Sequence, residues 1–297
     1  MSTESIDPRY VDVDQWPTEQ AVAAMYESQL AAVAAIGSQT GRIAAAADAA
    51  AGRLRLGGRL IFAGAGTSGR IAVQDGVELY PTFNWPPDRM LFLMAGGLAA
   101  LTEAAEGAED DADAARREIA AGHVAAQDVL IGVAASGRTP YTLAATEAAR
   151  EAGALTIGIA NNADSPLTGA AEHAIAAVTG PEIVAGSTRM KAGTAQKAVL
   201  NILSTAIMLR LGRVHRGMMV NMRISNEKLL MRGAAMVRDI AGVDEAAARD
   251  ALHRAGNDIK TAVLIARGTD PAHAAASLAQ HDGILSAAMR AQEATDA

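Results

Sequence analysis

The feature of this sequence that most constrains its fold is the alternation of short apolar runs with longer helical stretches. Five runs have the composition of buried strands and cover residues 59–63, 90–94, 128–133, 155–160 and 173–178. Strands that alternate with helices are joined by right-handed crossovers, which place helices on both faces of a parallel sheet. The sequence therefore predicts an α/β fold, a three-layer sandwich with a five-stranded, mostly parallel sheet.

The helical stretches also predict how the chain is divided into domains. One or two long helices are expected within residues 18–56, and further helices over 68–79, 98–121, 140–152, 187–211 and 220–238. From residue 243 onward the pattern changes to short alanine-rich pieces separated by glycine and proline signals. We therefore predict a large domain over residues 1–241 and a small helical subdomain over 242–297.

Composition argues against several classes of protein. The chain has no cysteine, so it can form neither a disulfide framework nor a thiolate metal site. It carries 33 acidic and 26 basic residues, and its aromatic content is only 3%, which disfavours nucleic-acid binding. Its six histidines are scattered without the spacing of metal ligands, so we expect no metal and no cofactor.

No apolar segment is long enough to span a bilayer, which takes about 18 uninterrupted apolar residues. The first residues are acidic and lack the basic start and apolar run of a secretory signal. We therefore expect a cytoplasmic protein with no membrane partner.

A glycine-rich loop, Gly64-Ala65-Gly66-Thr67-Ser68-Gly69, follows the first predicted strand and opens a helix. The string satisfies the G-x-G-x-x-G pattern of dinucleotide sites, a weak match when it stands alone. Thr67 and Ser68 supply hydroxyl donors at a helix N-terminus, where the helix dipole favours a phosphate dianion. These residues could also be simple helix caps.

A second loop of the same chemistry, residues 135–139, follows the third predicted strand and also opens a helix. Ser136 and Thr139 supply its hydroxyls, and Pro140 suits the first position of the helix. Loops at the carboxyl ends of parallel strands converge on one crevice, where open α/β sheets bind ligands. The pair of loops favours phosphate binding over capping.

A third segment, residues 186–194, combines hydroxyl donors with Arg189 and Lys191 near a helix start. Cations at a helix N-terminus oppose the dipole, and a sequence tolerates them best beside an anion. That anion could be a ligand. Alternatively the two cations pair with Glu182 or face water.

Two carboxylates are candidates for acid/base chemistry. Glu78 lies near the C-terminal end of the helix that the first loop opens, where the dipole opposes a negative charge, a property useful in a general acid. Glu109 lies in the acidic run 106–113, which by itself is more typical of a solvated helix start. Spacing alone does not select Glu109 over its neighbours.

Several strings together resemble signatures of the N-acetylmuramic acid 6-phosphate etherases. They are GAGTSGR at 64–70, PTF at 81–83, EGAED at 106–110, AASGRTPY at 134–141 and GSTRMKAGTAQK at 186–197. They occur in the family's order and at matching spacing over nearly the whole chain. The family belongs to the sugar isomerase (SIS) superfamily of phosphosugar-binding sandwiches, to which the glucokinase regulatory protein is related.

The resemblance implies a lyase that cleaves the lactyl ether of N-acetylmuramic acid 6-phosphate in cell-wall recycling. Its products are N-acetylglucosamine 6-phosphate and D-lactate, formed by elimination and hydration without metal or organic cofactor. It also implies a homodimer, and a tail like the family's small ubiquitin-associated-like (UBA-like) helical subdomain. Two other functions stay open: a regulatory protein that binds phosphosugars without turnover, and a phosphosugar aldose–ketose isomerase. A dinucleotide enzyme ranks last.

Position by position, the resemblance implies roles for the candidate residues. Glu78 matches the acid that protonates departing lactate, and Glu109 matches the second acid/base residue. The residues implied to hold the phosphate are Thr67, Ser68, Ser136, Gly137 and Thr139. The residues implied to contact the sugar or its carboxylate, with weaker support, are Ser187, Thr188 and Lys191.

Overall fold

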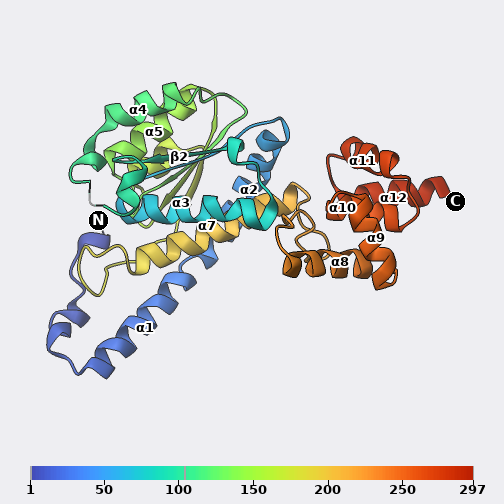
Figure 1. Ribbon diagram of the computed structural model, residues 1–297. Helices are drawn as coiled ribbons and strands as arrows, with labels where there is room; N and C mark the ends of the chain where they lie inside the picture. The colour runs from blue at the N-terminus through green and yellow to red at the C-terminus, as the bar shows by residue number, and fades with distance from the viewer. Residues whose placement is uncertain (1, 104, 297) are drawn as a thin grey trace. The chain divides into compact units, whose positions relative to one another are not determined.

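A five-stranded sheet lies at the centre of the first of two compact units in the computed structural model, which describes residues 2–103 and 105–296 (Figure 1). Its strands are β1 (Leu60–Gly64), β2 (Met90–Met94), β3 (Val129–Val133), β4 (Leu155–Ala160) and β5 (His173–Ala176). They pair in the order β2-β1-β3-β4-β5, and all four pairings are parallel. The predicted α/β class and five-stranded sheet are confirmed.

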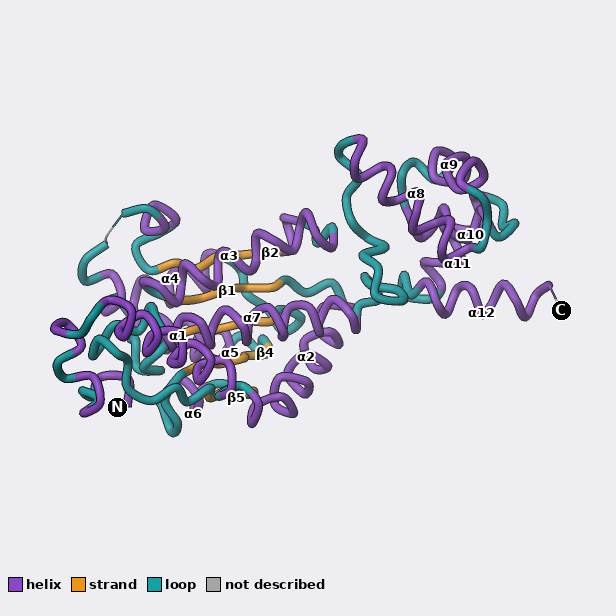
Figure 2. Tube along the Cα trace, turned by 90° about the horizontal axis from the view of Figure 1, so that it is seen from below, coloured by secondary structure: helices purple, strands orange, loops and turns teal. Residues whose placement is uncertain are grey.

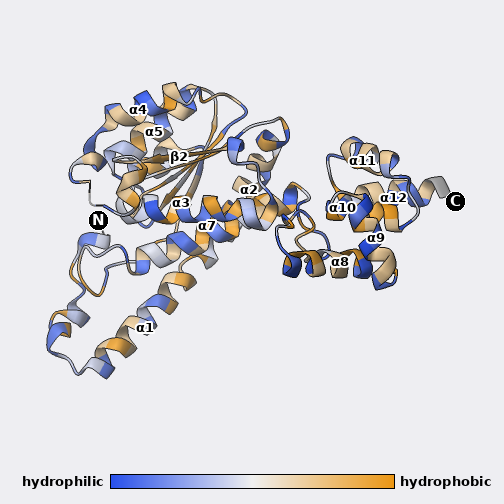
Figure 3. Ribbon diagram, in the orientation of Figure 1, coloured by the Kyte–Doolittle hydropathy of each residue, from blue (hydrophilic) through white to orange (hydrophobic). Residues whose placement is uncertain are grey.

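Helices cover both faces of the sheet, and Figure 2 shows the strands enclosed between them. On one face lie α4 (Ala112–Ala121) and α5 (Pro140–Glu151), and on the other lie α2 (Thr40–Arg55), α3 (Gly66–Phe83) and α7 (Lys191–Arg210). The strands alternate between these layers: Ile61 packs with the α4 and α5 cluster, whereas Phe62 faces Gly76 of α3. Because both faces are covered, β1, β3 and β4 are buried at every residue, and Figure 3 shows the strands as a hydrophobic layer.

Two long helices, α1 (Thr18–Ala34) and α2, occupy the region predicted to hold one or two. The prediction of a helix over residues 98–121 is wrong in its first half. Among the residues of that range that the structure describes, only those of α4 form an α-helix, preceded by short 3-10 turns at Leu98–Leu101 and Ala108–Asp110. Gly107 takes a left-handed conformation (φ 71°), and the Asp111 side chain accepts a hydrogen bond from the Ala114 N–H, which fixes the helix start at Ala112.

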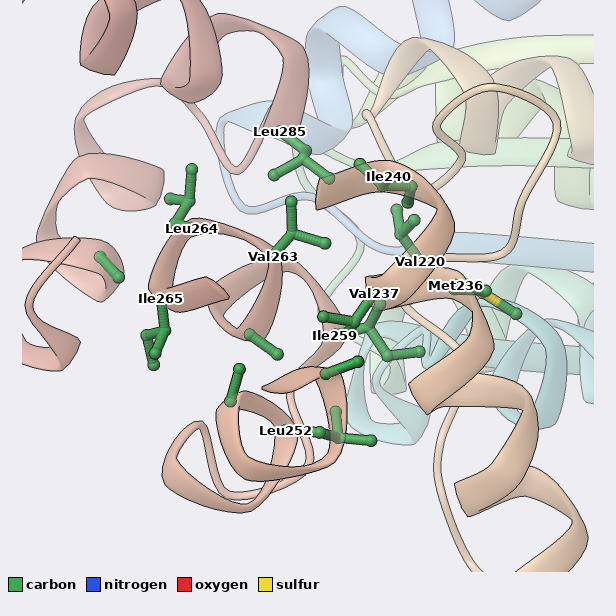
Figure 4. Packing of buried hydrophobic residues seen from close by; sticks show 14 of the residues in the cluster. Val220, Met236, Val237, Ile240, Leu252, Ile259, Val263, Leu264, Ile265 and Leu285 are labelled. Carbon is green, nitrogen blue, oxygen red and sulfur yellow. The ribbon is translucent and has the colours of Figure 1, made fainter. Parts of the chain in front are cut away.

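The second compact unit comprises residues 78–86 and 207–297. Its helices are α8 (Glu227–Ala241), α9 (Glu245–Arg254), α10 (Ile259–Ala266), α11 (Pro271–Gln280) and α12 (Leu285–Asp296). Figure 4 shows Val237 of α8 near Ile259 and Leu252, within one hydrophobic cluster. The compact unit therefore begins before the predicted boundary at 241/242, because α8 packs on α9 and α10. The division into domains 1–241 and 242–297, and the UBA-like nature of the tail, stay predictions.

Candidate active site

The first loop carries Thr67 and Ser68 on the first turn of α3, directly after the carboxyl end of β1. The helix start lies unusually close to the strand, and glycine is what permits it. A Cβ atom on Gly69 would lie 2.7 Å from the carbonyl oxygen of Gly64 and 2.4 Å from the Met94 sulfur. The tight packing fixes the two hydroxyls and the free N–H groups of α3 at the edge of the sheet.

The second loop follows β3, the neighbour of β1, with Gly64 and Val133 in register. Gly137 turns the chain with φ 64°, in a place where a Cβ atom would lie 2.2 Å from the Ser165 hydroxyl oxygen. The Ser136 hydroxyl accepts a hydrogen bond from the Arg138 N–H at 3.1 Å. Thr139 is the N-cap residue of α5, but its side chain makes no capping hydrogen bond. The simple capping interpretation therefore fails for Thr139, whose hydroxyl is available to a ligand.

The two loops converge on one cavity of about 370 Å³. Thr67, Ser68, Ser136 and Thr139 line it together, as expected from strand order, and Glu109 joins them from the turn before α4. The other lining residues are Glu4, Ala65, Gly66, Asp110, Ala135, Arg138, Pro140 and Thr188. Gly137 is buried behind its loop and is not a lining residue.

Glu109 is exposed and lies between this cavity and a second one of about 390 Å³, which it also lines. The loop that carries it is held from α3. The Arg70 guanidinium donates hydrogen bonds to the carbonyl oxygens of Ala100 at 3.0 Å and Glu103 at 3.1 Å. Two residues of the acidic run therefore have different positions: Asp111 caps α4, whereas Glu109 lines the cavity.

The third motif is only partly at the cavity. Thr188 lines it, whereas Ser187 and Lys191 are not among its lining residues. The N-terminus of α7 is already occupied by Glu182, a fully buried residue whose carboxylate accepts the N–H groups of Lys191 and Ala192, each at 2.9 Å. The Lys191 ammonium donates to the Thr179 carbonyl oxygen at 2.9 Å, and burial lowers its pKa despite the nearby carboxylates of Glu182 and Asp7. Sugar contacts by Ser187 and Lys191 stay predictions.

Glu78 is an exposed residue of α3, ten positions after Ser68. At about 1.5 Å per residue this spacing is ~15 Å along the helix axis. Glu78 is not among the residues that line the phosphate-loop cavity.

Two lining residues that sequence reasoning did not select are Arg138 and Glu4. Arg138 lies inside the second loop, residues 135–139, so its place in the sequence could have identified it as a lining residue. Glu4 has no such signal, because only the path of the folded chain brings the N-terminal segment to the cavity. Among the described lining residues Arg138 is the one cation, beside the carboxylates of Glu4, Glu109 and Asp110. The groups here that could hold an anion are therefore mainly hydroxyls, N–H groups and helix N-termini.

The described residues contain no group of three or more histidine or acidic residues placed to hold a metal ion. No helix among them is long and apolar enough to cross a membrane.

Comparison with known protein families places two overlapping models on this region. The N-terminal SIS domain of glucokinase regulatory protein matches residues 42–150, and the SIS domain matches residues 108–206. The first match covers both loops, at residues 64–69 and 135–139, and the second match covers the loop at 135–139.

Comparison with curated proteins and solved structures extends the match to nearly the whole chain. N-acetylmuramic acid 6-phosphate etherase of Deinococcus radiodurans is 48% identical, over 89% of this chain and 86% of that protein. The Streptomyces avermitilis protein of the same name is 45% identical, over 98% of this chain and 94% of its own length. A Bacteroides fragilis structure, described as a phosphosugar isomerase involved in capsule formation, shares the fold with a TM-score of 0.53. It is 21% identical and covers 68% of this chain and 99% of its own.

Proposed function

The chain belongs to the N-acetylmuramic acid 6-phosphate etherase family, and we propose that it cleaves the D-lactyl ether of N-acetylmuramic acid 6-phosphate. The products are N-acetylglucosamine 6-phosphate and D-lactate, which makes the enzyme a carbon–oxygen lyase. The observation that carries the proposal is the single cavity in which the hydroxyls of both phosphate-type loops meet Glu109. A regulatory binder or an isomerase is less well supported, because the relatives are named as etherases.

We assign the 6-phosphate to the end of the cavity formed by Thr67, Ser68, Ser136 and Thr139. The N-termini of α3 and α5 both open there, so aligned backbone N–H groups add to the hydroxyl donors. Gly137 has no side chain to contact the phosphate, and its positive φ lets the second loop turn sharply.

The chemistry that follows needs proton transfer and no electron acceptor. Opening of the sugar ring leaves an aldehyde at C1, which makes the C2 proton acidic. Glu109, as general base, removes that proton while the C3–O bond breaks and the electron pair leaves with the lactyl oxygen. A general acid protonates the departing oxygen to give lactate. Water then adds to C3 of the unsaturated aldehyde, and a proton returns to C2.

Glu78 is the family's acid by position, and its spacing bears on which active site it serves. Glu78 follows Ser68 by ten residues in α3 and is not among the residues that line the cavity of its own chain. We therefore propose that the protein is a homodimer in which Glu78 serves the cavity of the second copy.

An apolar stripe on α1 supports the homodimer. Val22, Tyr26, Leu30 and Val33 recur at helical spacing, and each is between 51% and 64% exposed. Large apolar side chains exposed in a row on one helix are typical of a protein interface.

The etherase proposal is tested by measuring D-lactate released from N-acetylmuramic acid 6-phosphate. Glu109→Gln should lower kcat by 10²-fold or more, the usual contribution of a general base. Asp113→Asn is the matched control, because Asp113 lies in the same acidic run but pairs with Arg116 outside the cavity. Absence of lactate release by the unmodified protein refutes the etherase. Fructose 6-phosphate formed from glucose 6-phosphate would favour the isomerase, and a thermal shift without consumption of any sugar phosphate would favour the regulatory binder.

The dimer proposal has a separate test by complementation. Glu78→Gln and Glu109→Gln should each retain little activity alone, but a mixed dimer contains one site with both native glutamates. After the two variants are unfolded and refolded together, activity should return to about one quarter of that of the unmodified protein, since half the dimers are mixed and half their sites are intact. No recovery would place Glu78 in its own chain's site or show that the protein is monomeric.

A further inference from the structure

The N-terminal segment brings a carboxylate into the phosphosugar cavity that no motif assigns. Glu4 lines the cavity together with Thr188, on the side of the loop that precedes α7. Its Oε2 atom lies so near Gly186 that an added Cβ there would be 3.3 Å away. Figure 1 shows the start of the chain beside this loop and the beginning of α3.

Hydrogen bonds hold this segment to the second phosphate loop. Thr3 is fully buried, and its hydroxyl accepts a hydrogen bond from the Asn162 side-chain amide at 3.0 Å. The same amide nitrogen donates to the carbonyl oxygen of Ala135 at 3.0 Å, one residue before Ser136. Asn162 therefore joins the residue before Glu4 to the loop expected to hold the phosphate.

A local turn follows a few residues further on. Asp7 is 94% buried and accepts hydrogen bonds from Arg9, both from its backbone N–H at 3.0 Å and from its guanidinium at 2.6 Å. The Arg9 side chain holds the pKa of Asp7 below its usual value. Glu4 is thus an exposed side chain between the buried residues Thr3 and Asp7.

The charge of Glu4 decides what it can bind. A carboxylate only accepts hydrogen bonds when ionised and repels both a phosphate dianion and a lactyl carboxylate. Sugar hydroxyls are the donors that such a group can accept from, and ring opening adds a free hydroxyl at C5 beside the one at C4. We propose that Glu4 is a substrate-binding residue that accepts a hydrogen bond from a sugar hydroxyl, and that Thr3 is its positioning residue. This assignment rests on the proposed function for the identity of the sugar.

The test compares binding of the sugar with binding of phosphate alone. Glu4→Gln and Glu4→Ala should raise KM for N-acetylmuramic acid 6-phosphate by about 10- to 100-fold, as expected for the loss of a hydrogen bond to a charged group. Inhibition by inorganic phosphate should be unchanged or stronger, since it has no sugar hydroxyl and a nearby negative charge is gone. Thr3→Val, which keeps the side-chain shape but removes the acceptor for Asn162, should raise KM with a smaller change in kcat.

Glu147→Gln is the matched control, because Glu147 is exposed in α5, outside the cavity. If the Glu4 variants match this control in KM, the proposal is wrong. If they lose phosphate inhibition together with sugar affinity, Glu4 is structural and the proposal is equally wrong. The binding of N-acetylglucosamine 6-phosphate, followed by calorimetry, tests Glu4 even if no lactate is released. The same loss of affinity would then support Glu4 while the etherase proposal failed.

Discussion

Replacing Gly69 by alanine tests whether the contact between α3 and β1 positions the phosphate site. The added Cβ would lie 2.7 Å from the Gly64 carbonyl oxygen, about 0.7 Å inside the 3.4 Å at which ordinary contact begins. The Met94 side chain, at 2.4 Å, can rotate away, but Gly64 is held in register with strands on both sides. The first turn of α3 must therefore move outward.

The energetic effect follows from two opposing contributions. Overpacking of this size costs about 1–3 kcal/mol, whereas alanine in place of glycine inside a helix returns about 0.5–1 kcal/mol. We expect Gly69→Ala to lower the free energy of unfolding by about 1–2 kcal/mol. Ser68 moves with the helix turn, and since binding groups tolerate displacements of only about 0.5 Å, inorganic phosphate should inhibit lactate release at least tenfold more weakly.

The measurements are urea denaturation followed by circular dichroism and inhibition of lactate release by inorganic phosphate. Gly41→Ala is the control, because Gly41 lies in α2 and a Cβ there meets nothing within 4 Å. That variant should be more stable by about 0.5–1 kcal/mol, with unchanged phosphate inhibition. The reasoning is refuted if Gly69→Ala behaves like Gly41→Ala in both assays.

Three further outcomes are expected. Glu182→Gln removes the charge that accepts two N–H groups of α7 and should lower the free energy of unfolding by about 2 kcal/mol in urea titrations; an unchanged midpoint would contradict this role. Burial raises the pKa of Asp128, but hydrogen bonds from Arg59 and from backbone N–H groups outweigh burial, so the net pKa is lowered. The stabilisation of the fold by the ionised Asp128 carboxylate is therefore present above about pH 4 and is lost as the pH falls further. Asp128→Asn should therefore be less stable at pH 7 and lose less stability on acidification, which thermal unfolding from pH 7 to pH 3 measures. Thr139→Val should weaken phosphate inhibition about tenfold with an unchanged melting temperature, and an unaltered inhibition constant would remove Thr139 from the site.

The parts of this structure that were predictable are those set by local pattern. Continuous apolar runs bounded by glycine identified the strands to within about two residues at their ends, because a strand covered on both faces has no polar side. Hydroxyls after two of those runs predicted a shared cavity, since neighbouring parallel strands end at the same edge.

The parts that were not predictable depend on contacts between distant segments. Residues 105–111 have a helix-forming composition, yet Gly107 and the Asp111 cap turn them into the loop that brings Glu109 to the cavity. The sequence offers Glu182 only as a possible ion-pair partner of Arg189 and Lys191, whereas the fold shows its carboxylate accepting two N–H groups at the start of α7. Glu4 lies 60 residues before the start of the first loop in sequence, so no spacing rule connects it with the cavity.

The distribution of charge in the cavity also determines how a sugar phosphate must lie in it. Hydroxyls, two helix N-termini and Arg138 favour the dianion near the strand ends, while Glu4, Glu109 and Asp110 repel it from the rest of the cavity. A ligand with a phosphate at one end and hydroxyls along its body satisfies both parts, and the reversed orientation satisfies neither. In the proposed binding mode the same carboxylates lie along the sugar and place its carbons beside Glu109. Under this proposal, repulsion orients the anionic substrate in one productive direction, although the chain has a formal net charge of −7.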